Sequence, residues 1–320
     1  MKKLFKIFCI VGLSLFLAGG AIFGVGFIFA KGDLKALSHL KGEEYAYTET
    51  AENPIESIYI RYDSSASIAV TFSDTADSVS VEYVGLKTKK DKPASEITLS
   101  DTNGELRIVE KTKLVGKFST FNFLKLKVKV TLPADRTYDL TLDGTTGDID
   151  LKGNGKLNNL ILSTDTGDID TERAEINCLG KMNLETDTGD IELGMFTADS
   201  LEMETDTGDI SLQDGTVKGK IDVNVDSGEI EIEGRLSAQE IVIETDTGDV
   251  ETERGVLDAM IIRLEADTGD IEVMLTGNKS NYTIYVEKDT GKCNVSSQAG
   301  GEKQLFIETD TGDIHVTFAE

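Results

Sequence analysis

Along residues 143–320, short runs of alternating apolar and polar residues are separated by a polar motif at which the alternation changes phase. Leu160 and Leu162 precede one copy of the motif with one parity, whereas Ile169 and Thr171 follow it with the other. Side chains of a strand point alternately to its two faces, so a change of phase indicates a bend between two strands. We therefore predict that each unit contains two short strands that meet at a sharp corner.

The corner carries the motif "TDTGDI", which the chain repeats with few changes. Its glycine occupies positions 147, 167, 189, 208, 228, 248, 269, 291 and 312, at spacings of 19 to 22 residues. A fixed period near 20 residues is the signature of a stacked repeat array. One unit cannot bury its own apolar face, so parallel strands of successive units should stack around a continuous core. The predicted fold is all-β: a β-solenoid with rungs of about 20 residues and two short strands per rung.

Residues 57–142 resemble β-structure without this repeat. Runs such as "SIYIRY" and "ELRIVE" alternate and are rich in β-branched and aromatic residues, and Asn103-Gly104 is a hairpin signal. We predict a less regular β region over residues 57–142 that caps the repeats, followed by the repeat β-solenoid over residues 143–320.

The N-terminus predicts a membrane anchor. Three lysines precede Ile7–Ala30, a run of 24 residues without a charge. Spanning a bilayer takes about 20 residues, whereas the apolar part of a signal peptide has about 7–15. We predict an uncleaved transmembrane anchor over residues 1–30 and a membrane-proximal linker over 31–56, with a signal peptide cleaved near Ala21 as the alternative. The preceding lysines favour a cytoplasmic N-terminus, so the C-terminal body of this single-pass cell-membrane protein should be extracytoplasmic.

The negative charge is concentrated in the repeats. Residues 143–320 contain 41 acidic and 13 basic residues, a net charge of −28, while the whole chain has −26. Such a body repels DNA, RNA and anionic lipid, so we expect no nucleic-acid partner. The expected partner is a component of the cell envelope or another membrane protein.

Stacking should align the two aspartates of the motif into two columns, a first column before the glycine and a second column after it. Carboxylates one rung apart repel by about 1 kcal/mol in water and about 3.5 kcal/mol at an effective dielectric constant of 20. Backbone N–H groups, splaying into solvent, or bound divalent cations could offset this repulsion. A structural turn is the preferred interpretation; the alternative is a turn that also binds Ca²⁺, for which oxygen-rich corners are suited. The residues of this calcium hypothesis are Asp165, Asp168, Asp187, Asp190, Asp206, Asp209, Asp246, Asp249, Asp267 and Asp270.

Residues and motifs typical of active sites are scarce. We therefore expect that the protein is not an enzyme and that it binds no cofactor other than Ca²⁺. The only histidines are His39 and His315, and no phosphate-binding or dinucleotide motif is present. Carboxylates are abundant, but an active site should interrupt the repeat locally. The one conspicuous interruption, "EKDTGKCN", introduces Lys288 and Lys292, which are better explained as relief of negative charge.

The run "VTLPADRTYDLTLDGTTGDIDL", Val130 to Leu151, together with the "TDTGDI" units after it, resembles a bacterial family of cell-envelope β-strand-repeat proteins. That family is labelled putative adhesin, domain of unknown function. The resemblance covers about residues 55–320 and implies an extracytoplasmic β-solenoid, with some relatives linked to cell-envelope stress responses. It supplies no catalytic residues to carry over.

These observations together predict an envelope-anchored, acidic β-solenoid that acts as a non-enzymatic binding, adhesion or scaffold module. Two alternatives remain open at this point. One is a sensory or regulatory module of the cell-envelope stress response; the other is a β-helix enzyme that acts on carbohydrate.

Overall fold

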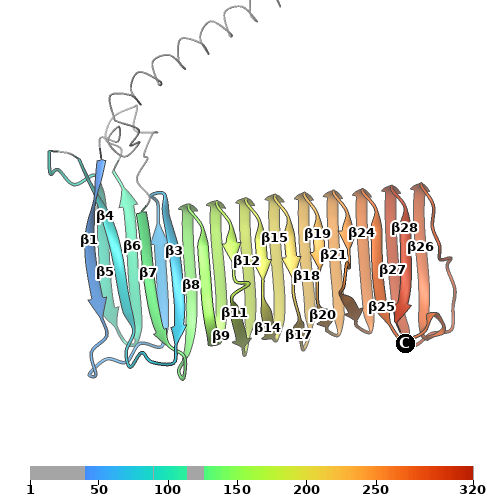
Figure 1. The fold of residues 1–320 in the computed structure, drawn as a ribbon, viewed down its shortest axis with the longest axis horizontal. Coiled ribbons are helices and arrows are strands. Elements are labelled where there is room, and N and C mark those ends of the chain that lie inside the picture. Colours follow the sequence, from blue (N-terminus) through green and yellow to red (C-terminus); the bar gives the residue numbers. More distant parts are fainter. Residues whose placement is uncertain (1–39, 89, 114–125, 320) are drawn as a thin grey trace, which may run out of the picture.

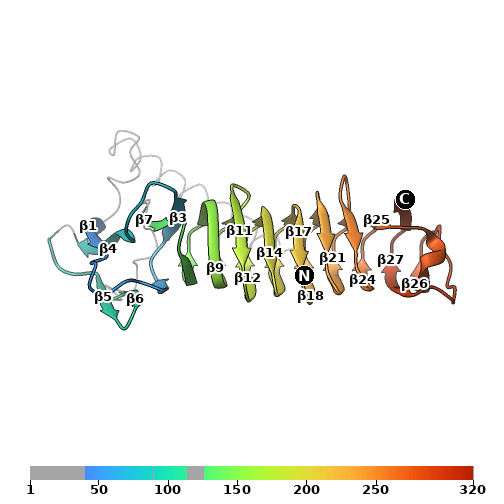
Figure 2. The same cartoon turned by 90° about the horizontal axis from the view of Figure 1, so that it is seen from below.

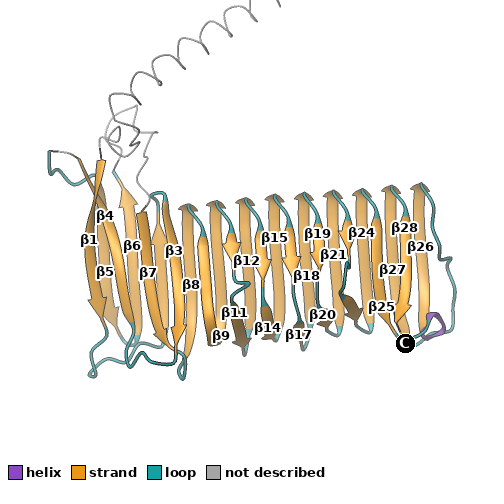
Figure 3. Ribbon diagram, viewed as in Figure 1, coloured by secondary structure: helices purple, strands orange, loops and turns teal. Residues whose placement is uncertain are grey.

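A computed structural model describes residues 40–88, 90–113 and 126–319 of the chain. They form one long stack of strands, with a single short helix near the C-terminal end (Figures 1 and 3). The predicted all-β solenoid is therefore confirmed. No helix in this part of the chain is long and apolar enough to cross a membrane. The predicted anchor, residues 1–30, lies outside the described residues.

A regular rung contains one long strand and two short ones. In β15 (Ser200–Thr207), β16 (Ile210–Leu212) and β17 (Gly215–Val217), each strand pairs in parallel with its equivalent in the neighbouring rungs. The long strands end together at one edge of the stack, the upper edge in Figure 1, where the "TDTGDI" motif turns the chain into the first short strand. Figure 2 shows long strands such as β18 and β24 on one side and β11, β14 and β17 on the other.

The remaining strands of the repeats follow the same pattern. The long strands are β9 (Ile149–Thr166), β12 (Lys181–Thr188), β18 (Lys220–Ser227), β21 (Glu240–Thr247), β24 (Ile261–Thr268), β26 (Tyr282–Thr290) and β27 (Lys303–Thr311). The strands after the corner are β10 (Ile169–Asp170), β13 (Ile191–Leu193), β19 (Ile230–Ile232), β22 (Val250–Glu251), β25 (Ile271–Thr276) and β28 (Ile314–Ala319). The strands that complete a rung are β11 (Ala174–Cys178), β14 (Met195–Ala198), β20 (Arg235–Ser237) and β23 (Val256–Asp258).

The prediction of two strands per rung is wrong, because the second arm of the rung bends once more. Ile191 and Leu193 are buried at odd positions, whereas Phe196 and Ala198 are buried at even ones. The bend falls at Gly194, where a Cβ atom would lie 2.6–2.9 Å from three carbonyl oxygens. This second change of phase divides the arm into β13 and β14.

Leucine, isoleucine, valine and methionine side chains from both faces fill the interior. Leu201 and Met203 of β15 and Ile210 and Leu212 of β16 are all at most 1% exposed. They belong to one continuous core cluster that runs the length of the stack. The core explains why each rung depends on its neighbours, since burial of apolar area contributes about 25 cal/mol per Å² only when a second rung covers the first.

The N-terminal region contains further rungs rather than a separate layer. β2 (Ser57–Tyr62) pairs with β8 (Thr137–Thr146), and β3 (Ala66–Ser73) pairs with the first part of β9, both in parallel. β6 (Glu105–Thr112) and β7 (Leu126–Pro133) then extend the same two sheets outwards. β8 spans the predicted boundary between residues 142 and 143.

Antiparallel strands end the stack on the N-terminal side. β5 (Ser95–Thr102) pairs with β6, β4 (Ser80–Thr88) pairs with β7, and β1 (Leu40–Thr48) pairs with β4. The sequence predicts that residues 40–48 belong to a linker. This is wrong, because they form β1. The reason is a favourable edge: Tyr45 stacks on Tyr83 of β4 with ring centroids 5.4 Å apart, and β1 covers the open edge of that sheet.

At the C-terminal end the last two rungs are exchanged. β27 lies between β24 and β26, so Thr311 pairs with both Thr268 and Thr290. After β25 the chain forms a 3-10 helix (Lys279–Asn281), then β26, and then a segment over residues 291–302. It returns in β27, which fills the space beside β24. The aspartate columns therefore do not follow sequence order here.

Candidate functional site

The glycine of each corner is required by two features of the stack. Gly228 has φ +157°, and a Cβ atom there would lie 1.9 Å from the carbonyl oxygen of Gly208 in the preceding rung. From Gly189 onwards, every motif glycine has its equivalent carbonyl oxygen within 1.8–2.2 Å of a Cβ atom. Successive corners thus approach too closely for any side chain, which explains why this position does not vary.

The first threonine of the motif is a structural residue. Thr205 is 1% exposed, and its Oγ1 donates to the carbonyl oxygen of Gly189 in the preceding rung at 3.1 Å. The same bond is made by Thr164, Thr186, Thr245 and Thr309 at 3.1–3.4 Å. These threonines face the interior and are not available to a ligand.

The second-column aspartates bind backbone. The backbone N–H of Asp209 donates to Oδ1 of Asp190 at 2.8 Å, one rung away. The same bond joins Asp168 to Asp148, Asp190 to Asp168, Glu229 to Asp209, Asp270 to Asp249, Asp313 to Asp270 and Lys292 to Asp313, at 2.7 to 3.3 Å. A backbone N–H beside each carboxylate favours its ionised form, so this ladder offsets the repulsion within the column.

The ladder has one gap. Among the described residues, no hydrogen bond joins the N–H of Asp249 to Glu229, the one glutamate in the second column. Burial raises the pKa of Glu229, and the neighbouring Glu251 and Asp209 raise it further.

The first-column aspartates are exposed and free of protein partners. Asp165, Asp187, Asp206, Asp246 and Asp267 all lie on the surface, and within the described ranges no hydrogen bond or ion pair involves their side chains. Their charges are therefore separated by solvent. Of the ten residues of the calcium hypothesis, the five in the first column remain open to a ligand and the five in the second accept backbone N–H groups. The calcium hypothesis stays a prediction.

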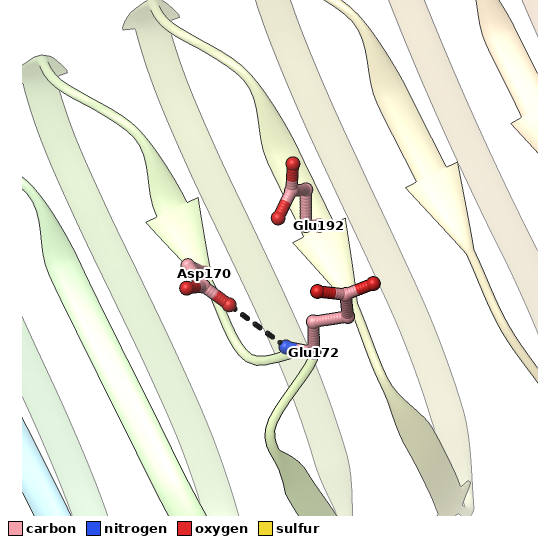
Figure 4. A group of neighbouring side chains, drawn as sticks. All are labelled: Asp170, Glu172 and Glu192. Atoms are coloured by element: carbon pink, nitrogen blue, oxygen red, sulfur yellow. Dashed lines mark hydrogen bonds between the residues drawn. The ribbon is translucent and has the colours of Figure 1, made fainter.

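Three carboxylates that we had not selected lie together on the other arm. The ligand atoms of Asp170, Glu172 and Glu192 fall within 4.8 Å of one another, the only such group of three in the described part of the chain (Figure 4). Asp170 is already used: it accepts from the Glu172 N–H at 3.0 Å and from Arg173 at 2.7 Å. Sequence reasoning missed the group because Glu192 comes from the next rung, in register with Asp170.

Excess negative charge extends over both faces of the stack. Burial raises the pKa of one set of glutamates, and neighbouring carboxylates raise it further. This set is Glu192, Glu204, Glu229, Glu231, Glu251 and Glu265. Asp258 behaves differently: burial opposes its ionisation, but bonds from Lys303, Thr276 and Arg235 outweigh that effect and lower its pKa to about 2.

We expect the protein to become more stable as pH falls from 8 to about 5. The six glutamates bind protons more tightly in the folded chain than in the unfolded chain, so protonation favours folding over that window. Below about pH 4.5 the trend should reverse, because Glu49 and Asp258 have lowered pKa values and their stabilisation is lost on protonation. Melting temperatures at constant ionic strength test this, and a steady fall from pH 8 to 5 would contradict it.

The two columns should respond differently to the loss of a carboxylate. We expect Asp209→Ala to destabilise the fold by about 1–2 kcal/mol, because it removes the acceptor for the Glu229 N–H. Asp206→Ala, three residues away in the first column, should change stability by less than about 0.5 kcal/mol or increase it. Urea unfolding of the two variants measures the difference; equal destabilisation would show that the ladder contributes nothing.

The chain is similar to several solved bacterial proteins. A putative adhesin from Parabacteroides distasonis is 14% identical, with a TM-score of 0.48, over 87% of this chain and 97% of its own. A putative lipid binding protein from the same organism is 14% identical, with a TM-score of 0.47 over the same shares. A putative adhesin from Bacteroides fragilis is 16% identical, with a TM-score of 0.40, over 86% of this chain and 97% of its own.

None of these similarities is close enough to carry over a ligand, and comparison with the curated proteins gives no match. The family model is decisive, because it matches residues 55–318, which include the N-terminal rungs and every corner described above. The resemblance noted in the sequence is thus confirmed: the chain belongs to the Toastrack DUF4097 family.

Proposed function

We propose that the protein is a non-enzymatic binding or scaffold module, held at the cell envelope by its N-terminal apolar segment and displaying the acidic solenoid outside the cytoplasmic membrane. One observation carries this proposal: the first-column aspartates are exposed and their side chains unpaired, along one edge of a stack in which the first threonine, the glycine and the second aspartate of the motif are used for structure. The edge is the part of the repeat that architecture leaves available.

A regular array suits a repetitive ligand. Parallel strands are about 4.8 Å apart, so the first column presents one carboxylate per rung at that spacing. Each contact alone would be weak, but several on one rigid edge combine through high effective concentration. The expected ligand is a cationic or Ca²⁺-bridged component of the envelope, since the charge of the body repels anionic surfaces.

The proposed location rests on the sequence. Ile7–Ala30 is long enough to span a bilayer, and β1 begins at Leu40, only ten residues after that run. The solenoid would then begin close to the membrane and extend its acidic repeats away from it. A partner within the membrane, contacting the N-terminal strands, is compatible with the same arrangement.

The full chain in detergent, incubated with cell-envelope fractions with and without Ca²⁺, tests the proposal. A variant with four first-column aspartates changed to Asn should be retained at least severalfold less if the edge binds the envelope component. The four residues are Asp187, Asp206, Asp226 and Asp246. The matched control removes four charges from the other arm (Glu172, Glu192, Glu231 and Glu251 changed to Gln) and should retain binding. Equal losses in both variants would show nonspecific attraction, and unchanged retention in the first would refute the edge as the binding surface.

Calcium is tested separately by thermal unfolding. If Ca²⁺ binds the first column, millimolar Ca²⁺ should raise the melting temperature relative to EDTA, because a ligand of the folded state stabilises it by mass action. The aspartate-to-asparagine variant should lose this increase. An unchanged melting temperature in the unmodified chain would exclude the calcium hypothesis and leave direct binding of a cationic ligand.

A further inference from the structure

A cluster of aromatic rings and glutamates lies at the C-terminal end of the stack, on the outer face of the long strands. Tyr285 of β26 stacks on Phe306 of β27, with centroids 4.8 Å apart and rings inclined by 8°. Tyr285 is 52% exposed. The ring stack ends at β26, the outermost long strand of the solenoid, in the orange-red region of Figure 1.

The ring stack of Tyr285 and Phe306 already contacts one cationic side chain. The guanidinium of Arg263, one strand further in, lies over the ring of Phe306 at 4.1 Å from its centroid. Its Nε is 3.4 Å from Oε1 of Glu240, so this cation is paired with a carboxylate as well as with a ring. The arrangement shows that the outer face of these strands accommodates a cation stacked on an aromatic ring beside an acidic group.

A column of glutamates runs beside the rings. Glu244, Glu265, Glu308 and Glu287 occupy equivalent positions on four successive strands, two residues beyond the aromatic column. The register places Glu265 between Glu244 and Glu308, and burial together with these two neighbours raises the pKa of Glu265. No basic side chain is paired with these four glutamates in the described part of the chain.

Rings and carboxylates line one cavity. It has a volume of about 340 Å³ and is bounded by all four glutamates, Arg263, Tyr285 and Phe306. This size suits a small organic ligand rather than a bare metal ion. Four carboxylates against one guanidinium make the cavity strongly negative, and the rings add attraction for positive charge.

We propose that this cavity is a binding site for organic ammonium ions, of which a linear polyamine is the simplest example. Phe306 is already covered by Tyr285 and Arg263, so Tyr285 contacts the alkyl chain and attracts its charge, and the glutamate column pairs with successive ammonium groups. The site is separate from the aspartate edge and goes beyond the proposed function, because it does not depend on what that edge binds.

Calorimetric titration of the full chain with spermidine, at an ionic strength of about 0.15 M, tests the site. Tyr285→Leu keeps an apolar side chain but removes the ring face, and should weaken binding about two- to fivefold. Glu265→Gln should weaken it by a similar factor. The matched control is Glu185→Gln, which removes a glutamate from the same column at a rung whose neighbouring outward residues are not aromatic, and should leave the affinity unchanged.

Three results would overturn the proposal: no measurable binding, equal weakening by Glu185→Gln and Glu265→Gln, or binding of a neutral oligosaccharide in place of spermidine. Two- to fivefold weaker spermidine binding in Tyr285→Leu, with an unchanged melting temperature, would support it. Failure here leaves the edge proposal intact, because the envelope-retention experiment uses variants that do not touch this cavity.

Discussion

Replacing Gly228 by alanine is expected to destabilise the protein by at least about 3 kcal/mol. A non-glycine residue at this φ costs about 1–3 kcal/mol. The added Cβ atom, 1.9 Å from the Gly208 carbonyl oxygen, must also force the two rungs apart. Separation weakens neighbouring interstrand hydrogen bonds, each contributing about 1 kcal/mol. Urea unfolding followed by circular dichroism measures the loss.

Gly144→Ala is the matched control, because Gly144 lies at the same edge but not at the bend. A Cβ atom there would meet Oγ1 of Thr164 at 3.4 Å, an ordinary contact, and no strained φ is involved. Ala266 already occupies the equivalent position of a later rung. The free energy of unfolding should change by less than about 1 kcal/mol. It could increase, because alanine lowers the conformational entropy of the unfolded chain. If both alanine variants lost the same stability, close approach of the corners would not be the cause.

Deleting residues 302–320 is expected to remove two rungs instead of one. β26 has β27 as its only neighbouring strand in the described structure, so loss of β27 leaves β26 without a sheet to join. The segment 278–300 should then become sensitive to protease. β24 would be left as an open edge, and aggregation should follow. Limited proteolysis with mass spectrometry identifies the cleaved segment.

Deleting residues 278–301 provides the contrasting variant. It joins Gly277 to Glu302 and leaves a two-residue connection, as long as the Lys218-Gly219 connection of a regular rung. The connection is feasible because Lys303 Nζ donates to Oγ1 of Thr276 at 3.1 Å. This variant should stay folded, with β27 as the last strand. If it unfolds while the shorter C-terminal deletion remains intact, the exchanged order of β26 and β27 is wrong.

The repeated corner could be predicted from the sequence because it leaves a strong local signal. A phase change and a conserved spacing of the glycine both report the bend directly, since the backbone itself imposes them. The third strand of each rung was missed because its phase change is marked only weakly, at Gly194 in one rung and at other residue types elsewhere. Short strands of two or three residues carry too little alternation to be recognised.

Long-range order was harder to predict. Nothing local to β26 or β27 states that the later strand inserts beside β24, because that choice depends on which core faces match once the stack has formed. The same is true of β1, whose polar sequence resembles a linker until β4 presents an edge to it. Non-local pairing depends on partners that single-segment patterns do not contain.

The sequence predicts the two aspartate columns, but not which column accepts backbone hydrogen bonds and which is free. Both aspartates of the motif look alike in sequence, yet Asp165 is free and Asp168 accepts a backbone bond in one direction and donates its own N–H in the other. The difference follows from a shift of three residues around the bend, which decides whether a carboxylate faces the next rung or solvent. The glutamate and aromatic columns at the C-terminal end were missed because their members come from separate strands, Tyr285 from β26 and Phe306 from β27, and the exchange places Arg263 of β24 beside Phe306.

Residue-specific amide hydrogen exchange tests the central claim most directly, namely that second-column carboxylates hold successive corners together. The N–H groups of Asp209 and Asp270 should exchange slowly, because each donates to the aspartate of the preceding rung. Asp249, which follows Glu229 and has no such acceptor in the described structure, should exchange at least about tenfold faster. Equally fast exchange at all three positions would contradict the account and would mean that the second aspartate of the motif is free to bind a ligand.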